Sequence, residues 1–109
     1  METPTVGDIV AIKFPYSDLS SDKVRPALVI AVAEFGDLIV CQITSKPYTS
    51  RLSVRISPSD AKGMIVESYI RPDKIFTSDK SLVTRTIAKV SPAKLKDTKL
   101  ALKQILGTP

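Results

Sequence analysis

A mainly β (α+β) fold is predicted by the sequence: one small, strongly bent sheet or barrel of about five to seven strands with a C-terminal helix. Short runs of Val, Ile and Leu, bounded by Gly, Pro, Asp and Ser, are typical of strands. Only the last stretch, which begins at Ser91-Pro92, carries apolar residues at helical spacing. A chain of 109 residues suits a single domain, residues 1–109, with a modest core.

Residues 23–46 predict the central hairpin of this sheet. Two dense apolar runs are joined by Glu-Phe-Gly-Asp at residues 34–37, and a short connection containing Gly favours an antiparallel hairpin. Because such a hairpin places the start of its first strand beside the end of its second, we expect Arg25 and Thr44 at one end of the sheet. A guanidinium and a hydroxyl together suit a phosphate, since both donate hydrogen bonds. The hairpin alone favours a plainer interpretation, in which Arg25 is a surface residue and Thr44 an ordinary strand former.

The remaining segments complete the sheet and add the helix. Residues 14–24 are rich in Ser and Asp and predict a polar loop, which would act beside Arg25 as a ligand-gripping flap. Ser91 and Pro92 suit the cap and the first position of a helix that Gly107 ends. Further strands are expected at residues 7–13, 51–56, 64–70, 74–78 and 85–90, with a turn at 57–63.

The chain has no histidine and one cysteine, which removes several mechanisms. Ser-His-Asp and Cys-His catalytic arrangements and zinc sites of the Cys/His type cannot be built from it. The acidic residues are scattered without a pair spaced for Mg²⁺, so no metal and no cofactor is expected. Cys41 stands within an apolar run and is expected to be a small core residue, not a nucleophile.

Composition also bears on the compartment. No apolar run approaches the ~20 residues of a membrane-spanning helix. The first eight residues, METPTVGD, lack the basic and apolar pattern of a signal peptide. With its single cysteine, the chain is expected to be a cytoplasmic protein without membrane contact.

The net charge of +5 is unevenly distributed. Residues 1–60 carry six basic and seven acidic side chains, whereas residues 61–109 carry ten basic and four acidic ones. A basic half suggests a polyanionic partner, nucleic acid first. For the last twenty residues alone, a solvated lysine face on a helix is the simpler interpretation.

Five short motifs follow one another along the chain: GDIV at 7–10, FP at 14–15, RPALVI at 25–30, ITS at 43–45 and IRPDKI at 70–75. In this order and spacing the chain resembles the PemK/MazF-like toxin family, from about Gly7 to the C-terminal helix. The resemblance implies an SH3-like barrel, a homodimer and a metal-independent endoribonuclease that cleaves single-stranded RNA (mRNA) at short sequences. It also implies a cognate antitoxin that holds the enzyme inactive.

The resemblance further implies roles for particular residues. By position, the family's catalytic arginine and threonine fall on Arg25 and Thr44. Arg25 is expected to stabilise the phosphorane that forms when a 2′-OH attacks the phosphate, with Thr44 orienting a phosphoryl oxygen. The products would carry a 2′,3′-cyclic phosphate and a 5′-OH. Contacts with RNA are expected from Phe14, Lys23, Ser45, Lys46 and Arg71.

The general base stays unassigned, because an arginine side chain is not readily deprotonated. Ser68 stands where one branch of the family has an acid, with Glu67 beside it, while Asp22 lies in the predicted flap. Two other functions stay open. One is a non-catalytic module that binds nucleic acid, and the other is a toxin-like scaffold that serves protein contacts.

Overall fold

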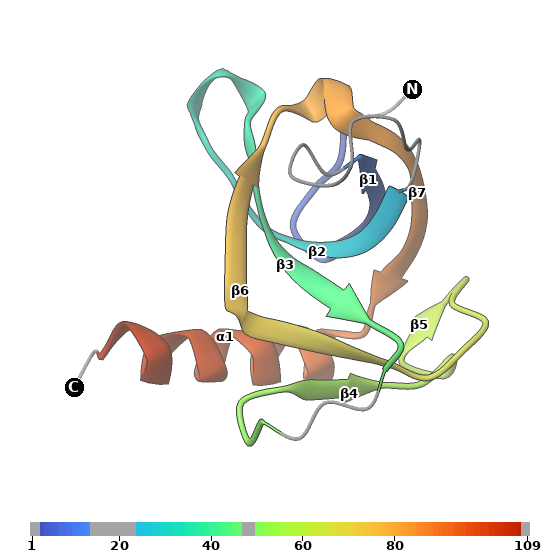
Figure 1. Cartoon of the computed structure of the whole chain (residues 1–109), viewed down its shortest axis with the longest axis vertical. Helices are drawn as coiled ribbons and strands as arrows, with labels where there is room; N and C mark the ends of the chain where they lie inside the picture. The colour runs from blue at the N-terminus through green and yellow to red at the C-terminus, as the bar shows by residue number, and fades with distance from the viewer. Residues whose placement is uncertain (1–2, 14–23, 47–49, 108–109) are drawn as a thin grey trace.

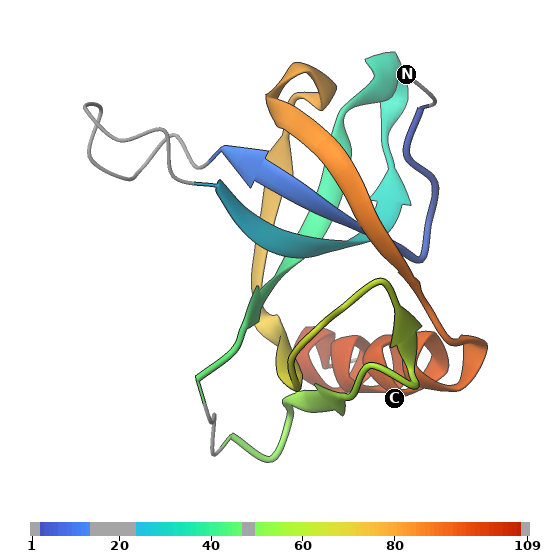
Figure 2. The ribbon, with the colours of Figure 1, turned by 90° about the vertical axis from the view of Figure 1, so that its right-hand side faces the viewer.

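A computed structural model describes residues 3–13, 24–46 and 50–107 of the chain. It contains one seven-stranded sheet in the order β4-β6-β3-β2-β1-β7-β5, bent strongly around itself, and one helix (Figures 1 and 2). The predicted fold class is therefore confirmed. The strands are β1 (Asp8–Lys13), β2 (Val24–Val32), β3 (Leu38–Thr44), β4 (Val54–Ile56), β5 (Ala61–Lys62), β6 (Ser68–Ser78) and β7 (Val83–Val90), and the helix is α1 (Pro92–Leu106).

The predicted central hairpin is present. Strands β2 and β3 pair antiparallel from Val32 opposite Leu38 to Ala27 opposite Gln42, and a 3₁₀ turn, η1 (Glu34–Gly36), joins them. A second 3₁₀ turn, η2 (Lys80–Leu82), joins β6 to β7. The predicted flap lies largely outside the described residues, as do Phe14, Asp22 and Lys23.

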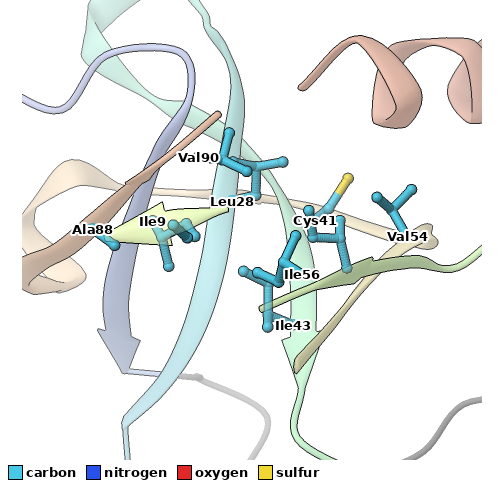
Figure 3. Packing of buried hydrophobic residues seen from close by; sticks show 10 residues of the cluster. Ile9, Leu28, Cys41, Ile43, Val54, Ile56, Ala88 and Val90 are labelled. Atoms are coloured by element: carbon cyan, nitrogen blue, oxygen red, sulfur yellow. The ribbon is translucent and has the colours of Figure 1, made fainter. Parts of the chain in front are cut away.

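The central strands are buried on both faces, and each face contributes to a different core. On β2, Ala27 and Val29 belong to a core inside the bent sheet, whereas Leu28 belongs to a second core. Strands β1 and β3 alternate in the same way. Figure 3 shows the second core, where Ile9, Leu28, Cys41 and Ile43 meet Val54, Ile56, Ala88 and Val90. Burial on both faces explains the near-continuous apolar runs of these strands.

The helix covers the second core. Leu95 and Leu102 pack against it, and the fully buried Thr98 satisfies its hydroxyl by donating to the Lys94 carbonyl oxygen at 2.9 Å. The cap predicted at Ser91 is confirmed, since its Oγ accepts from the Lys94 N–H at 3.3 Å. The predicted C-terminus is also confirmed, because Gly107 ends the helix in the left-handed conformation. No helix within the described ranges is long and apolar enough to cross a membrane.

The prediction of two strands around residues 71–73 is wrong. One strand, β6, runs through this segment, and its register against β3 shifts between Cys41, which pairs with Ile75, and Gln42, which pairs with Arg71. The shift leaves Pro72 and its two following residues without ladder partners, so the missing N–H of proline is not needed there. Residues 64–67, expected in the same element, precede β6 as irregular chain with one isolated bridge.

The other strand corrections concern short elements. The strand expected at 51–56 is confined to β4, because a turn at Ser50 takes up the residues before it. Ser50 Oγ accepts from the Leu52 N–H at 3.2 Å, and its carbonyl oxygen accepts from the Ser53 N–H at 3.1 Å. The two-residue strand β5 lies within the expected turn and pairs with the end of β7.

Replacement of Gly63 by alanine tests how closely the chain after β5 approaches β7. Gly63 has a φ of +114°, and a Cβ there would collide with the Ile87 carbonyl oxygen on β7. We expect Gly63→Ala to lower the free energy of unfolding by at least about 3 kcal/mol, because strain and overlap add. Gly107→Ala is the matched control. Its φ of +70° is also strained, but nothing lies within 4 Å of the added methyl, so about 1 kcal/mol is expected.

Urea unfolding of the two variants and the parent protein measures this difference. Equal losses of stability in the two variants would contradict the close approach of residue 63 to β7.

Candidate functional site

A groove of about 470 Å³ opens where β2 begins and β3 ends. It contains Arg25 and Thr44, as the hairpin geometry predicts. The ladder between the two strands reaches Ala27 opposite Gln42, and the same register continued for two residues would put Arg25 opposite Thr44. The lining residues come from three parts of the chain: Val24, Arg25, Pro26, Ile43, Thr44, Ser45, Lys46, Met64, Val66 and Ser68.

The hydroxyl of Thr44 makes a hydrogen bond with the backbone at the edge of this groove. Its Oγ1 accepts a hydrogen bond from the Lys46 backbone N–H at 3.2 Å. Because that bond occupies an oxygen lone pair, the hydroxyl proton stays available for donation to an acceptor such as a phosphoryl oxygen. Both Thr44 and Arg25 are half-buried, which restricts their side chains without closing them off from a ligand.

The charge of the groove suits an anion. Arg25 and Lys46 line it, and no carboxylate stands among its described lining residues. Ser45 and Lys46, both expected to contact RNA, are exposed at this edge. An anionic ligand would therefore meet two positive side chains and three hydroxyl-bearing side chains without a described negative charge beside them.

Arg71 is not among the residues that line the groove. It lies opposite Gln42, where β6 changes register, and its side chain is 20% exposed. Its Nε stands 3.9 Å from the Asp73 carboxylate, which provides a partner of opposite charge. The part of the structure that is described thus gives Arg71 a position in the bend of β6. Contact with RNA at Arg71 stays a prediction.

The candidates for a general base fall in three different places. Ser68 lines the groove, and its Oγ donates to the Val66 carbonyl oxygen at 3.2 Å. Glu67 is engaged elsewhere: its Oε1 lies 3.0 Å from the Arg55 Nε and accepts from the Tyr69 hydroxyl at 3.1 Å, which raises the pKa of Tyr69. Asp22 lies outside the described residues. The structure accordingly brings a hydroxyl, and no described carboxylate, into the groove.

One wall of the groove was missed by the sequence reasoning. Met64 and Val66 line it, next to Ile65, which is 89% exposed. Their apolar side chains favoured the assignment of a strand. The local signal for an irregular segment is Gly63 directly before them, because a glycine in or beside a strand often marks a bulge or a close approach of another backbone.

Cys41 has no part in the groove. It is fully buried in the second core, and burial, with a smaller effect of the Asp73 carboxylate, raises the pKa of its thiol to about 12. This is in agreement with its prediction as a core residue. Within the described residues, no group of three or more His, Cys, Asp or Glu side chains could hold a metal ion.

Known structures resemble this chain along nearly its whole length. An endoribonuclease in complex with its cognate antitoxin, from a mycobacterial species, aligns with a TM-score of 0.79 at 23% identity, and 97% of each chain is covered. MazF from Deinococcus radiodurans aligns with a TM-score of 0.80 at 21% identity and covers 99% of this chain and 100% of its own. A second mycobacterial endoribonuclease aligns with a TM-score of 0.77 at 24% identity, and the alignment covers 100% of this chain and 96% of its own. These likenesses show that the fold is shared.

Comparison with curated protein sequences gave no match. The family model of the PemK-like, MazF-like toxins of type II toxin–antitoxin systems, in contrast, matches residues 5–106. This span includes β1 to β7, both sides of the groove and α1. The chain therefore belongs to the PemK-like, MazF-like toxin family of type II toxin–antitoxin systems.

Proposed function

We propose that this toxin is an endoribonuclease that cleaves single-stranded RNA in the groove where β2 begins and β3 ends. The observation that carries the proposal is the presence of Arg25 and Thr44 in one groove, together with Lys46. Membership of the toxin family supports it, as do structural neighbours that are named endoribonucleases. Messenger RNA is the proposed substrate, and short sequences within it are the proposed sites of cleavage.

The reaction we propose uses the RNA's own 2′-OH as nucleophile. The 2′-oxygen forms a bond to phosphorus, the bond from phosphorus to the 5′-oxygen breaks, and the products carry a 2′,3′-cyclic phosphate and a 5′-OH. The 2′-OH loses its proton to a base that stays unassigned. The departing 5′-oxygen takes a proton from Arg25, or from solvent while Arg25 polarises it. Arg25 neutralises the charge that builds on the phosphorane, and the Thr44 hydroxyl donates to a phosphoryl oxygen.

The groove contacts extend this assignment. Ser45 and Lys46 follow Thr44 directly and would bind the sugar-phosphate backbone beside the reacting phosphate. Phe14, Lys23 and Arg71 complete the proposed set of RNA contacts. The proposed partners are RNA, a cognate antitoxin and a second copy of this chain, and the proposed compartment is the cytoplasm.

A non-catalytic nucleic-acid module is the second candidate function. Its support is specific: the described part of the groove offers cations and hydroxyl groups but no carboxylate to act as base. Such a module would bind RNA through the same residues and leave it intact.

Cleavage without a metal separates the two functions. Mixed-sequence single-stranded RNA, incubated with the pure protein in EDTA, should yield fragments with cyclic phosphate and 5′-OH ends. Arg25→Ala should lower kcat by roughly 10²–10³, the loss typical of removing one donor to a transition-state oxyanion. Thr44→Val should lower kcat by a similar or smaller factor, since it removes one hydroxyl while keeping the side-chain volume. End-group analysis and initial rates measure both effects.

Lys99→Gln is the matched control, because Lys99 is exposed on α1 and does not line the groove. Its kcat should equal that of the parent protein. If the parent leaves RNA intact while folded, the endoribonuclease proposal fails. If Arg25→Lys retains full activity, the two-pronged contact of the guanidinium with the phosphate is wrong.

The reactivity of Cys41 provides an independent check that its thiol is buried and takes no part in RNA cleavage. Since the pKa of its thiol is raised to about 12, the reactive thiolate is almost absent near pH 8 in the native protein. Iodoacetamide should therefore leave native protein unlabelled and its RNA cleavage unchanged, yet label it readily in denaturant. Mass spectrometry and cleavage assays on the same samples measure this. Rapid labelling with loss of activity in native buffer would contradict the placement of Cys41 in the core.

A further inference from the structure

Three side chains form a row across neighbouring strands at the end of the sheet that carries the groove. Thr44 on β3 pairs with Tyr69 on β6, and Tyr69 pairs in turn with Arg55 on β4. Neighbouring strands lie about 4.8 Å apart, so the row extends for roughly 10 Å beyond Thr44. In Figure 1 the end of β3, the first part of β6 and β4 lie next to one another at the lower side of the molecule.

These three residues share the face of the sheet that points away from the second core. Ile43, Ile70 and Val54, which alternate with them along the three strands, are buried in that core. Because successive side chains in a strand point to opposite faces, Thr44, Tyr69 and Arg55 lie on the other side. The Arg55 side chain is 68% exposed, and Tyr69 is half-buried. The row is thus accessible to a ligand that leaves the groove at Thr44.

A single carboxylate oxygen positions the arginine and the tyrosine. Glu67 Oε1 lies 3.0 Å from the Arg55 Nε and accepts from the Tyr69 hydroxyl at 3.1 Å. The contact with Glu67 uses Nε, so the other guanidinium nitrogens keep their N–H donors for a second acceptor. Glu67 therefore brings the guanidinium of Arg55 and the hydroxyl of Tyr69 to one carboxylate on the exposed surface.

The positive charge continues past Arg55. A hollow of about 340 Å³ between β4 and α1 is lined by Arg51, Arg55 and Lys94, with Asp97 as the acidic side chain among its lining residues. A polyanion that follows the row would meet these cations after leaving the two in the groove.

We propose that single-stranded RNA continues from the groove along this row, with a base stacked on Tyr69 and a neighbouring phosphate bound by Arg55. The inference rests on the proposed function, because it takes RNA to be the ligand of the groove. An aromatic ring beside a guanidinium is the combination used to hold single strands without dependence on sequence. Tyr69 and Arg55 are thus binding residues for the nucleotides adjoining the reacting phosphate, and Glu67 is their positioning residue.

Binding of uncleavable RNA tests the row separately from catalysis. A fluorescent 2′-O-methyl oligonucleotide of about 12 nucleotides lacks the nucleophilic hydroxyl, and its mixed sequence avoids any need to know the cleavage site. By anisotropy, Tyr69→Leu should weaken its binding roughly tenfold, whereas Tyr69→Phe should bind within about twofold of the parent protein because the ring remains.

Arg55→Gln tests the phosphate contact by its dependence on salt. The slope of log Kd against log salt concentration should fall in magnitude by about 0.7, the value for one phosphate contact to a single strand. Lys99→Gln, which removes a positive charge outside the row, should keep the slope of the parent protein. This variant pair also keeps the test valid should Tyr69→Leu fail to fold.

The outcomes distinguish the two proposals. If Tyr69→Leu and Arg55→Gln bind the long oligonucleotide as the parent protein does, the inference is wrong, even where Arg25 and Thr44 prove essential for cleavage. The row would then suit a protein partner instead. If both variants lose affinity but the parent protein leaves natural RNA intact, the inference on the row stands. Only the endoribonuclease proposal then fails.

Discussion

The double burial of β1, β2 and β3 is the constraint on which the rest of this structure depends. Each of these strands contributes alternate side chains to the core inside the bent sheet and to the core beneath α1. Fully burying one such side chain stabilises the fold by about 1.5–3 kcal/mol, and a shift of register by one residue would exchange the side chains of the two cores. The start of β2 and the end of β3 are therefore fixed, and Arg25 and Thr44 are fixed with them.

This constraint also separates what could be predicted from what could not. The hairpin and the helix follow from local signals: apolar runs joined by a short turn, and Ser91-Pro92 before a helical stripe that ends at Gly107. The course of β6 does not follow from local signals. Its continuity past Pro72 depends on a change of register against β3, a strand that is distant in sequence. The start of β4 was misplaced for a local reason, since the hydrogen bonds of the Ser50 turn take the place of strand pairing.

The same distinction applies to the site. That Arg25 and Thr44 share one end of the sheet follows from hairpin geometry, whereas their chemical roles came from the family resemblance. The row of Thr44, Tyr69 and Arg55 could not be found in this way, because three strands from different parts of the chain meet there. Glu67 illustrates the difference most clearly. Its position beside Ser68 suggested a base, but the fold directs its carboxylate to Arg55 and Tyr69.

A groove with cations and hydroxyl groups but no described carboxylate favours one kind of catalysis over another. In the proposed reaction, stabilisation of charge on the phosphorane needs only fixed donors. Arg25 and Thr44 are the donors proposed for this role, and the Thr44 Oγ1 accepts a hydrogen bond from the Lys46 backbone N–H. Transfer of the 2′-OH proton needs a group of suitable pKa, which arginine does not have. The same cations that stabilise the phosphorane would also attract any acidic protein segment. An acidic segment bound there would exclude the proposed RNA substrate by charge and by volume together.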